Sequence, residues 1–257
     1  MDVPFEQYLP SQVFILVLIF ARLGAMVMLM PGLGETYVNV RVRLFAALAL
    51  TLALAPAIEA SMPTAAPPLS TLILLVFGEF IIGIYFGLLA RMLLLTLDTT
   101  GRIVAFSTGL AAAQVFNPSS TGQGTLPGLF LSMLGILIFF VTDMHHMMIA
   151  AMVDSYQLFK PGQSLPINDL SDALTVIFAR SFTVAVQLAA PFMIFSLLFF
   201  VSLGIIARLM PQMQIFFVGL PIQLAVGILL MAGTLMALMQ VFTEYFASNL
   251  QTFMLPR

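Results

Sequence analysis

The stretch SFTVAVQLAAPFMIFSLLFFVSLGIIA (181–207) contains no Asp, Glu, Lys or Arg. The stretches 103–142 and 209–243 also lack all four of these residue types. Each of the three stretches is longer than the roughly 20 residues that a helix needs to cross a bilayer. Because Leu, Ala and Met dominate and no alternation of period two is visible, the sequence predicts helices rather than a β-barrel.

The composition of the whole chain points the same way. Of its 257 residues, 61% are hydrophobic and 8% are charged, whereas soluble domains have a charged share of about 25%. The formal net charge of −2 provides no basic face for nucleic acid. The absence of cysteine excludes disulfides, thiolate metal sites and cysteine nucleophiles, and we expect neither a metal nor a cofactor.

Pro/Gly-rich or charged breaks divide the chain into six apolar blocks. The blocks run over 11–30, 44–58, 69–97, 127–154, 173–206 and 212–246. We therefore predict one all-α, membrane-associated domain over residues 1–257, with about six hydrophobic helical segments. Pro191 lies inside the fifth block, where it removes a backbone donor from the middle of the helix.

A long polar insertion, GLAAAQVFNPSSTGQGTLPG (109–128), separates two of the apolar blocks. Irregular backbone at membrane depth survives only where protein buries it or where it lines a water-filled path. An ordinary loop outside the membrane explains the insertion equally well, so hydropathy alone leaves both interpretations open.

One cluster of ionisable residues, Asp143, His145 and His146, lies in the middle of the fourth block. Ionisable groups at membrane depth suggest a proton relay or a metal site. Adjacent histidines on a helix diverge by about 100°, which argues against a shared metal ion. We favour a role at a helix end or in packing over either functional alternative.

Glu79 is an isolated charge within an apolar block, in the segment FGEFIIGIYFG. Gly83 and Gly87 follow it with the GxxxG spacing that lets another backbone approach closely. Glu79 can line a conduit, or it can form a buried ion pair with Arg91 or Arg22 that fixes helix register, and we favour the ion pair. The candidate polar residues of the chain are Glu79, Arg91, Asp143, His145 and Arg208.

Five segments carry a more specific pattern. They are FARLGAMVMLMPGLG (20–34), VRVRLFAALALTLALAP (40–56), GEFIIGIYFGLLARM (78–92), DMHHMMIAAMVDSYQLFKPG (143–162) and RLMPQMQIFFVGLPIQLAVGILL (208–230). In this order they resemble the FliR family of flagellar export-gate proteins and, more distantly, the SctT proteins of injectisomes. The segment that begins at Arg208 is the most specific of the five.

The resemblance implies an assembly and a location. One copy of such a chain joins several FliP-like and FliQ-like subunits in a cone of kinked helical hairpins that conducts unfolded flagellar proteins. Residues 1–170 would correspond to a FliP-like part and residues 171–257 to a FliQ-like part. FlhB-like and FlhA-like proteins would be neighbours at the inner membrane of the flagellar basal body, with the cone largely on the periplasmic side, and no catalysis is implied.

The resemblance also implies a role for the polar insertion. The segment 112–124 would be a plug that projects into the closed pore. The candidate plug residues are Ala112, Ala113, Gln114, Val115, Phe116, Asn117, Pro118, Ser119 and Ser120. Family members often have Asp before this proline, so Asn117 weakens any claim of a charged gate.

Two other function classes remain open from the residues alone. A secondary transporter for a small solute would use Glu79, Asp143 and His145 as coupling groups. An intramembrane enzyme would depend on His145 or His146, but the sequence contains no GxSxG, Walker, HExxH or dinucleotide-binding glycine motif. The transporter should be stable on its own in detergent, whereas an export-gate subunit should need its partners.

Overall fold

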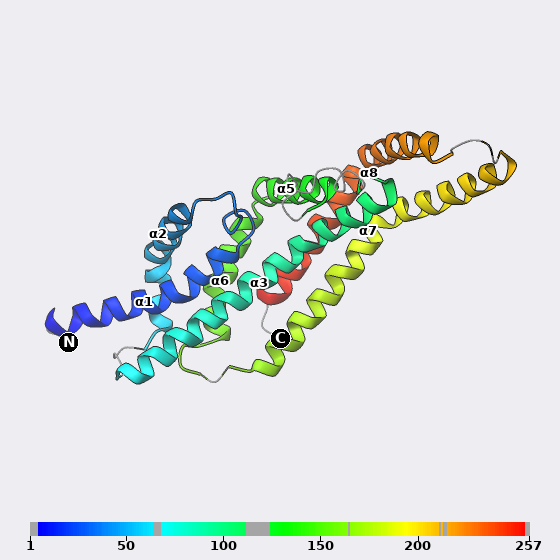
Figure 1. Cartoon of the computed structure of the whole chain (residues 1–257). Helices are drawn as coiled ribbons and strands as arrows, with labels where there is room; N and C mark the ends of the chain where they lie inside the picture. Colours follow the sequence, from blue (N-terminus) through cyan, green and yellow to red (C-terminus); the bar gives the residue numbers. More distant parts are fainter. Residues whose placement is uncertain are drawn as a thin grey trace. The chain divides into compact units, whose positions relative to one another are not determined.

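The computed structural model describes residues 5–63, 68–111, 124–163, 165–210, 212 and 215–254, and all regular elements in these ranges are helices (Figure 1). The all-α prediction is thereby confirmed for the described residues. The elements are α1 (Phe5–Leu29), α2 (Val40–Ile58), the short 3-10 helix η1 (Glu59–Ser61), α3 (Leu69–Thr108), α5 (Leu126–Val141), α6 (Met144–Leu158), α7 (Ile167–Leu209) and α8 (Ile215–Met254).

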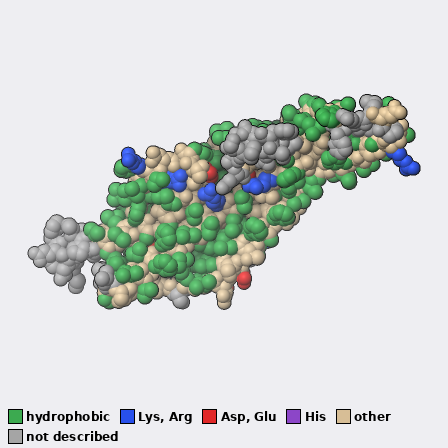
Figure 2. Space-filling view, viewed as in Figure 1, with side chains coloured by type: hydrophobic (Ala, Val, Ile, Leu, Met, Phe, Trp, Pro, Cys, Tyr) green, Lys and Arg blue, Asp and Glu red, His purple; other side chains and the backbone are tan. Residues whose placement is uncertain are grey.

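Five of these helices are long and apolar enough to cross a membrane. The number rises to six if α5 and α6 form one broken span, in agreement with about six predicted segments. The share of residues buried inside the chain differs widely, from 56% in the span of α1 to 11% in that of α7. Hydrophobic side chains also cover much of the face shown in Figure 2, so a large apolar surface is left uncovered by this chain.

The third helix is longer than the sequence indicates. Residues 98–102 were expected to break it, but α3 continues through them to Thr108. The Arg102 side chain donates to Asp98 one turn earlier at 2.8 Å, and the Thr100 hydroxyl bonds to the Thr96 carbonyl. These polar groups find partners on the same helix, so they do not interrupt it.

The fourth block is split where the sequence predicts one segment. Asp143 has a left-handed backbone with φ of 57° and separates α5 from α6. Non-glycine residues rarely adopt this conformation, and Asp is among the few that tolerate it. The Asp143 cluster therefore lies at a helix end.

Proline does not interrupt the long helices. Pro191 lies inside the continuous α7, and Pro221 lies inside α8. Apolar helices tolerate proline where neighbouring groups satisfy the freed carbonyls.

The chain forms two compact units. Unit 1 comprises residues 1–92, 142–177 and 247–257, and it holds α1, α2, α6 and the first part of α3. Its core is centred on α1, where Leu18, Ile19 and Leu23 are fully buried. This unit contains the two isolated charges of the first and third apolar blocks, Arg22 and Glu79.

Unit 2 comprises residues 93–141 and 178–246, and it holds α5 and most of α7 and α8. Its core includes edge-to-face contact between Phe139 and Phe246, with ring centroids 5.5 Å apart. Gly101 of α3 and Gly128 of α5 meet backbone to backbone, and a Cβ on Gly101 would overlap Gly128. The predicted division into FliP-like residues 1–170 and FliQ-like residues 171–257 concerns likeness to other subunits and stays a prediction.

Candidate functional site

The central feature of unit 1 is an ion pair with almost no exposure to solvent. Arg22 of α1 is 1% exposed and Glu79 of α3 is 2% exposed. The Arg22 Nε atom lies 2.6 Å from Glu79 Oε2, and Nη2 lies 3.0 Å from Oε1. This two-point geometry fixes both side chains and both helices. Glu79 therefore pairs with Arg22 and not with Arg91, the other partner that the sequence allows.

The same guanidinium joins α6 to the pair. Arg22 Nη1 donates to the Ser155 hydroxyl at 3.2 Å, and Nη2 donates to the Phe159 carbonyl at 2.8 Å. The guanidinium carbon also lies 3.9 Å from the centre of the Tyr156 ring. Cation–π contact adds to the hydrogen bonds at such a desolvated site. One arginine thus connects α1, α3 and the end of α6.

Glycines on α3 make this approach of helices possible. A Cβ on Gly83 would overlap the Arg22 carbonyl oxygen, and a Cβ on Gly87 would lie 2.7 Å from the Leu29 Cβ. Glu79, Gly83 and Gly87 are spaced four residues apart, so they form one stripe along α3 that faces α1. The stripe brings the backbones close enough for the bidentate pair to form.

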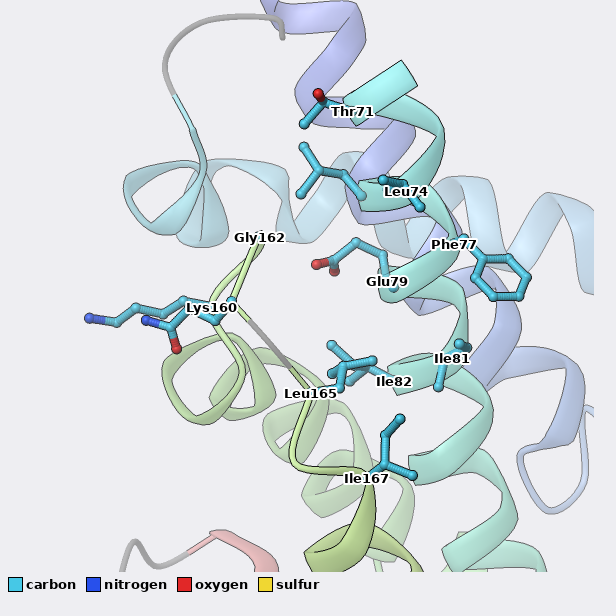
Figure 3. A pocket seen from close by; sticks show the side chains of 13 residues that line it. Thr71, Leu74, Phe77, Glu79, Ile81, Ile82, Lys160, Gly162, Leu165 and Ile167 are labelled. Atoms are coloured by element: carbon cyan, nitrogen blue, oxygen red, sulfur yellow. The ribbon is translucent and has the colours of Figure 1, made fainter. Parts of the chain in front are cut away.

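A cavity of about 540 Å³ adjoins this ion pair. Its walls come from the first half of α3 and from the segment between α6 and α7 (Figure 3). The side chain of Glu79 points toward that segment, while Leu74, Ile82 and Leu165 provide apolar lining. Both carboxylate oxygens accept bonds from Arg22, which leaves Glu79 suited to holding helices in register rather than to exchanging protons with the cavity.

The Asp143 cluster is more compact than the sequence indicates. The His145 and His146 rings are 4.1 Å apart between centroids, although adjacent helical side chains were expected to diverge. His146 Nδ1 lies 3.4 Å from Asp143 Oδ1, and one ligand atom from each of the three residues lies within 4.8 Å of the others. Asp143 immediately precedes α6 and has a left-handed backbone. Its carboxylate lies beside His146 in the first turn of that helix. The expected absence of a metal stays a prediction.

The structure does not bring the proposed transporter residues into one site. Glu79 is held with Ser155 near the end of α6, whereas Asp143 and His145 lie at its beginning. Ser155 follows Met144 by eleven positions, which corresponds to about 17 Å along a helix. Glu79 is therefore not part of the same cluster as the histidine pair, so the three residues named for solute-coupled transport do not form one site.

Two further candidate residues, Arg91 and Arg208, are among the described residues. Arg91 is on α3, twelve residues or about 18 Å along the helix from Glu79. Arg208 is exposed in the last turn of α7. The candidate plug residues 112–120 lie outside the described residues.

Comparison with known proteins explains this arrangement of apolar helices. Residues 13–249 match the family described as bacterial export proteins, family 1. The chain belongs to this family. It is 40% identical to the flagellar biosynthetic protein FliR of Caulobacter vibrioides, over 94% of this chain and 96% of the relative.

More distant relatives of the export family come from two systems. The flagellar biosynthetic protein FliR of Escherichia coli is 31% identical over 89% of this chain and 87% of its own length. The Yop proteins translocation protein T of Yersinia pestis is 30% identical over 66% of each chain. The resemblance inferred from the five sequence segments is thereby confirmed. The long apolar helices indicate that this export protein is embedded in a membrane.

Proposed function

We propose that this chain is a core subunit of the flagellar type III protein export gate. With FliP-like and FliQ-like subunits it forms the channel through which unfolded flagellar proteins leave the cell. Membership of the export family and the 40% identity to a flagellar relative support the proposal. The observation that carries it is the long apolar surface that this chain cannot cover by itself.

Helix α7 presents this surface most clearly. Its 43 residues correspond to about 65 Å along a helix, roughly twice the hydrocarbon thickness of a bilayer. In its most apolar stretch of 18 residues only 11% of the residues are buried inside the chain, and exposed side chains such as Ile194, Leu197 and Leu198 follow one another along the helix. Lipid can cover about half of such a helix at most, so helices of other subunits must cover the rest.

We propose partners and a place of assembly that would meet this requirement. Single-copy assembly with FliP-like and FliQ-like subunits supplies apolar helices of matching chemistry. FlhB-like and FlhA-like export proteins are the neighbours, and membrane lipid covers what the subunits leave open. The complex lies in the bacterial inner membrane at the flagellar basal body, largely on the periplasmic side.

The mechanism that we propose is steric and not enzymatic. The segment 112–124 closes the pore and moves aside when a polypeptide engages the gate. Exported proteins differ in sequence, so specific side-chain recognition would hold them back. Flexible apolar side chains, including the 18 methionines of this chain, can close around a polypeptide without recognising it.

Co-expression tests the proposed assembly. The chain is to be produced in detergent alone and together with its FliP-like and FliQ-like neighbours, and the copies of each subunit are to be counted by native mass spectrometry. We expect aggregation of the chain alone and a stable complex with a single copy of it. A monodisperse chain that is stable without partners would contradict the proposal.

Deleting residues Phe116–Ser120 tests the proposed plug. We expect the complex to assemble in normal yield, because α3 ends at Thr108 and α5 begins at Leu126, so the deletion removes no part of either helix. The closed channel should conduct small ions better than the parent in planar bilayers, because the obstruction is gone. Unchanged conductance in an intact complex would remove the plug assignment.

A further inference from the structure

The end of α3 is held by a side chain from α8, within unit 2. Gly109 has φ of 80° and ends the helix, and the Ala111 N–H bonds back to the Ala105 carbonyl at 3.0 Å. The last carbonyls of a helix have no donor within it. The Gln223 Nε2 atom of α8 donates to one of them, the Ser107 carbonyl, at 2.9 Å. Gln223 and Ser107 are both buried.

A second contact brings the two backbones together at the same place. A Cβ on Gly227 would lie 2.6 Å from the Thr108 Cβ, so any larger residue would push α8 away from the end of α3. Gln223 and Gly227 are four residues apart and therefore share one face of α8. Thr108 is fully buried, and its hydroxyl bonds to the Val104 carbonyl at 2.8 Å. The contact between Gly227 of α8 and Thr108 of α3 is thus closely packed, and Thr108 is fully buried in it.

We propose that Gln223 and Gly227 are positioning residues that fix the point at which the chain leaves α3 for the segment 112–120. This inference rests on the proposed function, in which that segment is the plug. Helix ends fray unless their free groups find partners. Here the partner belongs to another helix, so displacement of the α3 end breaks a buried hydrogen bond. The chain therefore leaves α3 from a fixed point at Gly109, three residues before the candidate plug segment in the sequence.

Replacing Gln223 with methionine tests the inference with little change in side-chain volume. The variant keeps the apolar stem and loses the donor, and Gln223→Ala gives a second, smaller variant. In the co-purified complex we expect normal recovery and a closed-state ion conductance raised roughly tenfold, the equilibrium shift that loss of one buried hydrogen bond produces. Gln240 is an exposed glutamine on the same helix, and Gln240→Ala is therefore the matched control. Its closed-state ion conductance should equal that of the parent.

Gly227→Ala approaches the same contact through different atoms and should raise the conductance as well. Gly233→Ala is its control, because a Cβ on Gly233 meets nothing within 4 Å. The plug deletion is measured in parallel. If the deletion conducts and the Gln223 and Gly227 variants stay closed, the inference is wrong and the plug stands. If the deletion stays closed, the plug assignment and the inference both fall, and loss of the complex in Gln223→Met would show a structural role alone.

Discussion

Replacement of Glu79 with alanine is expected to destabilise unit 1 by about 3–5 kcal/mol. The change leaves the Arg22 guanidinium buried without its carboxylate, and Arg22 is only 1% exposed. Its remaining contacts, to Ser155, to the Tyr156 ring and to the Phe159 carbonyl, carry no full negative charge. Thermal unfolding of the co-purified complex in detergent measures the effect. A variant as stable as the parent would show that the pair does not hold the helices.

A double replacement separates packing from charge. Arg22→Met with Glu79→Leu removes both charges and keeps apolar volume, a change that is often neutral in buried pairs. Ser155 keeps its hydrogen bond to the Met152 carbonyl at 2.6 Å, but the Phe159 carbonyl loses its donor. We therefore expect the double variant to recover all but about 1–3 kcal/mol of the parent stability. A stable double variant that no longer exports would instead assign a function to the charges themselves.

The second large effect is expected from Gly83→Ala. A Cβ at this position would overlap the Arg22 carbonyl oxygen, which is backbone and cannot rotate away. α1 and α3 would have to separate, and the bidentate pair one turn earlier would lengthen. Overpacking alone costs about 1–3 kcal/mol, and strain in the ion pair adds to this.

Gly78 provides the matched control on the same helix. A Cβ there meets nothing within 4 Å, so Gly78→Ala should gain up to about 1 kcal/mol from helix propensity. The two substitutions should therefore shift the unfolding temperature of the complex in opposite directions. Equal shifts would mean that Gly83 acts only through helix propensity and not through the contact with α1.

The sequence predicts the helical class and the small-residue stripe for physical reasons that are visible in one dimension. Arg22 and Glu79 are isolated charges in apolar blocks, and an isolated charge at membrane depth requires a partner of opposite sign. Two arginines were compatible with Glu79, and only the packing of α1 on α3 decides between them. Phe159 bonds to Arg22 through its backbone carbonyl, and the residue type at a position does not predict such a bond.

Other features differ from the prediction because local bonding overrides hydropathy. Asp98 and Arg102 resemble a break in the sequence, yet they bond to each other one turn apart and the helix continues. The sequence marks Asp143 by its charge and not by its backbone, and its left-handed conformation divides one predicted segment into two. Gln223 had a signal that could have been used, because a lone amide within GLPIQLAV requires a buried partner.

The length of α3, α7 and α8 also bears on how the chain is made. Each has at least 40 residues, or about 60 Å of helix, and would have to tilt by about 60° to fit a hydrocarbon layer of 30 Å. Membrane helices rarely tilt beyond about 40°. Under the proposed assembly, a newly synthesised copy is poorly matched to the bilayer that receives it until neighbouring subunits cover these helices. We therefore expect a copy made without its proposed neighbours to be degraded faster than a copy made together with them.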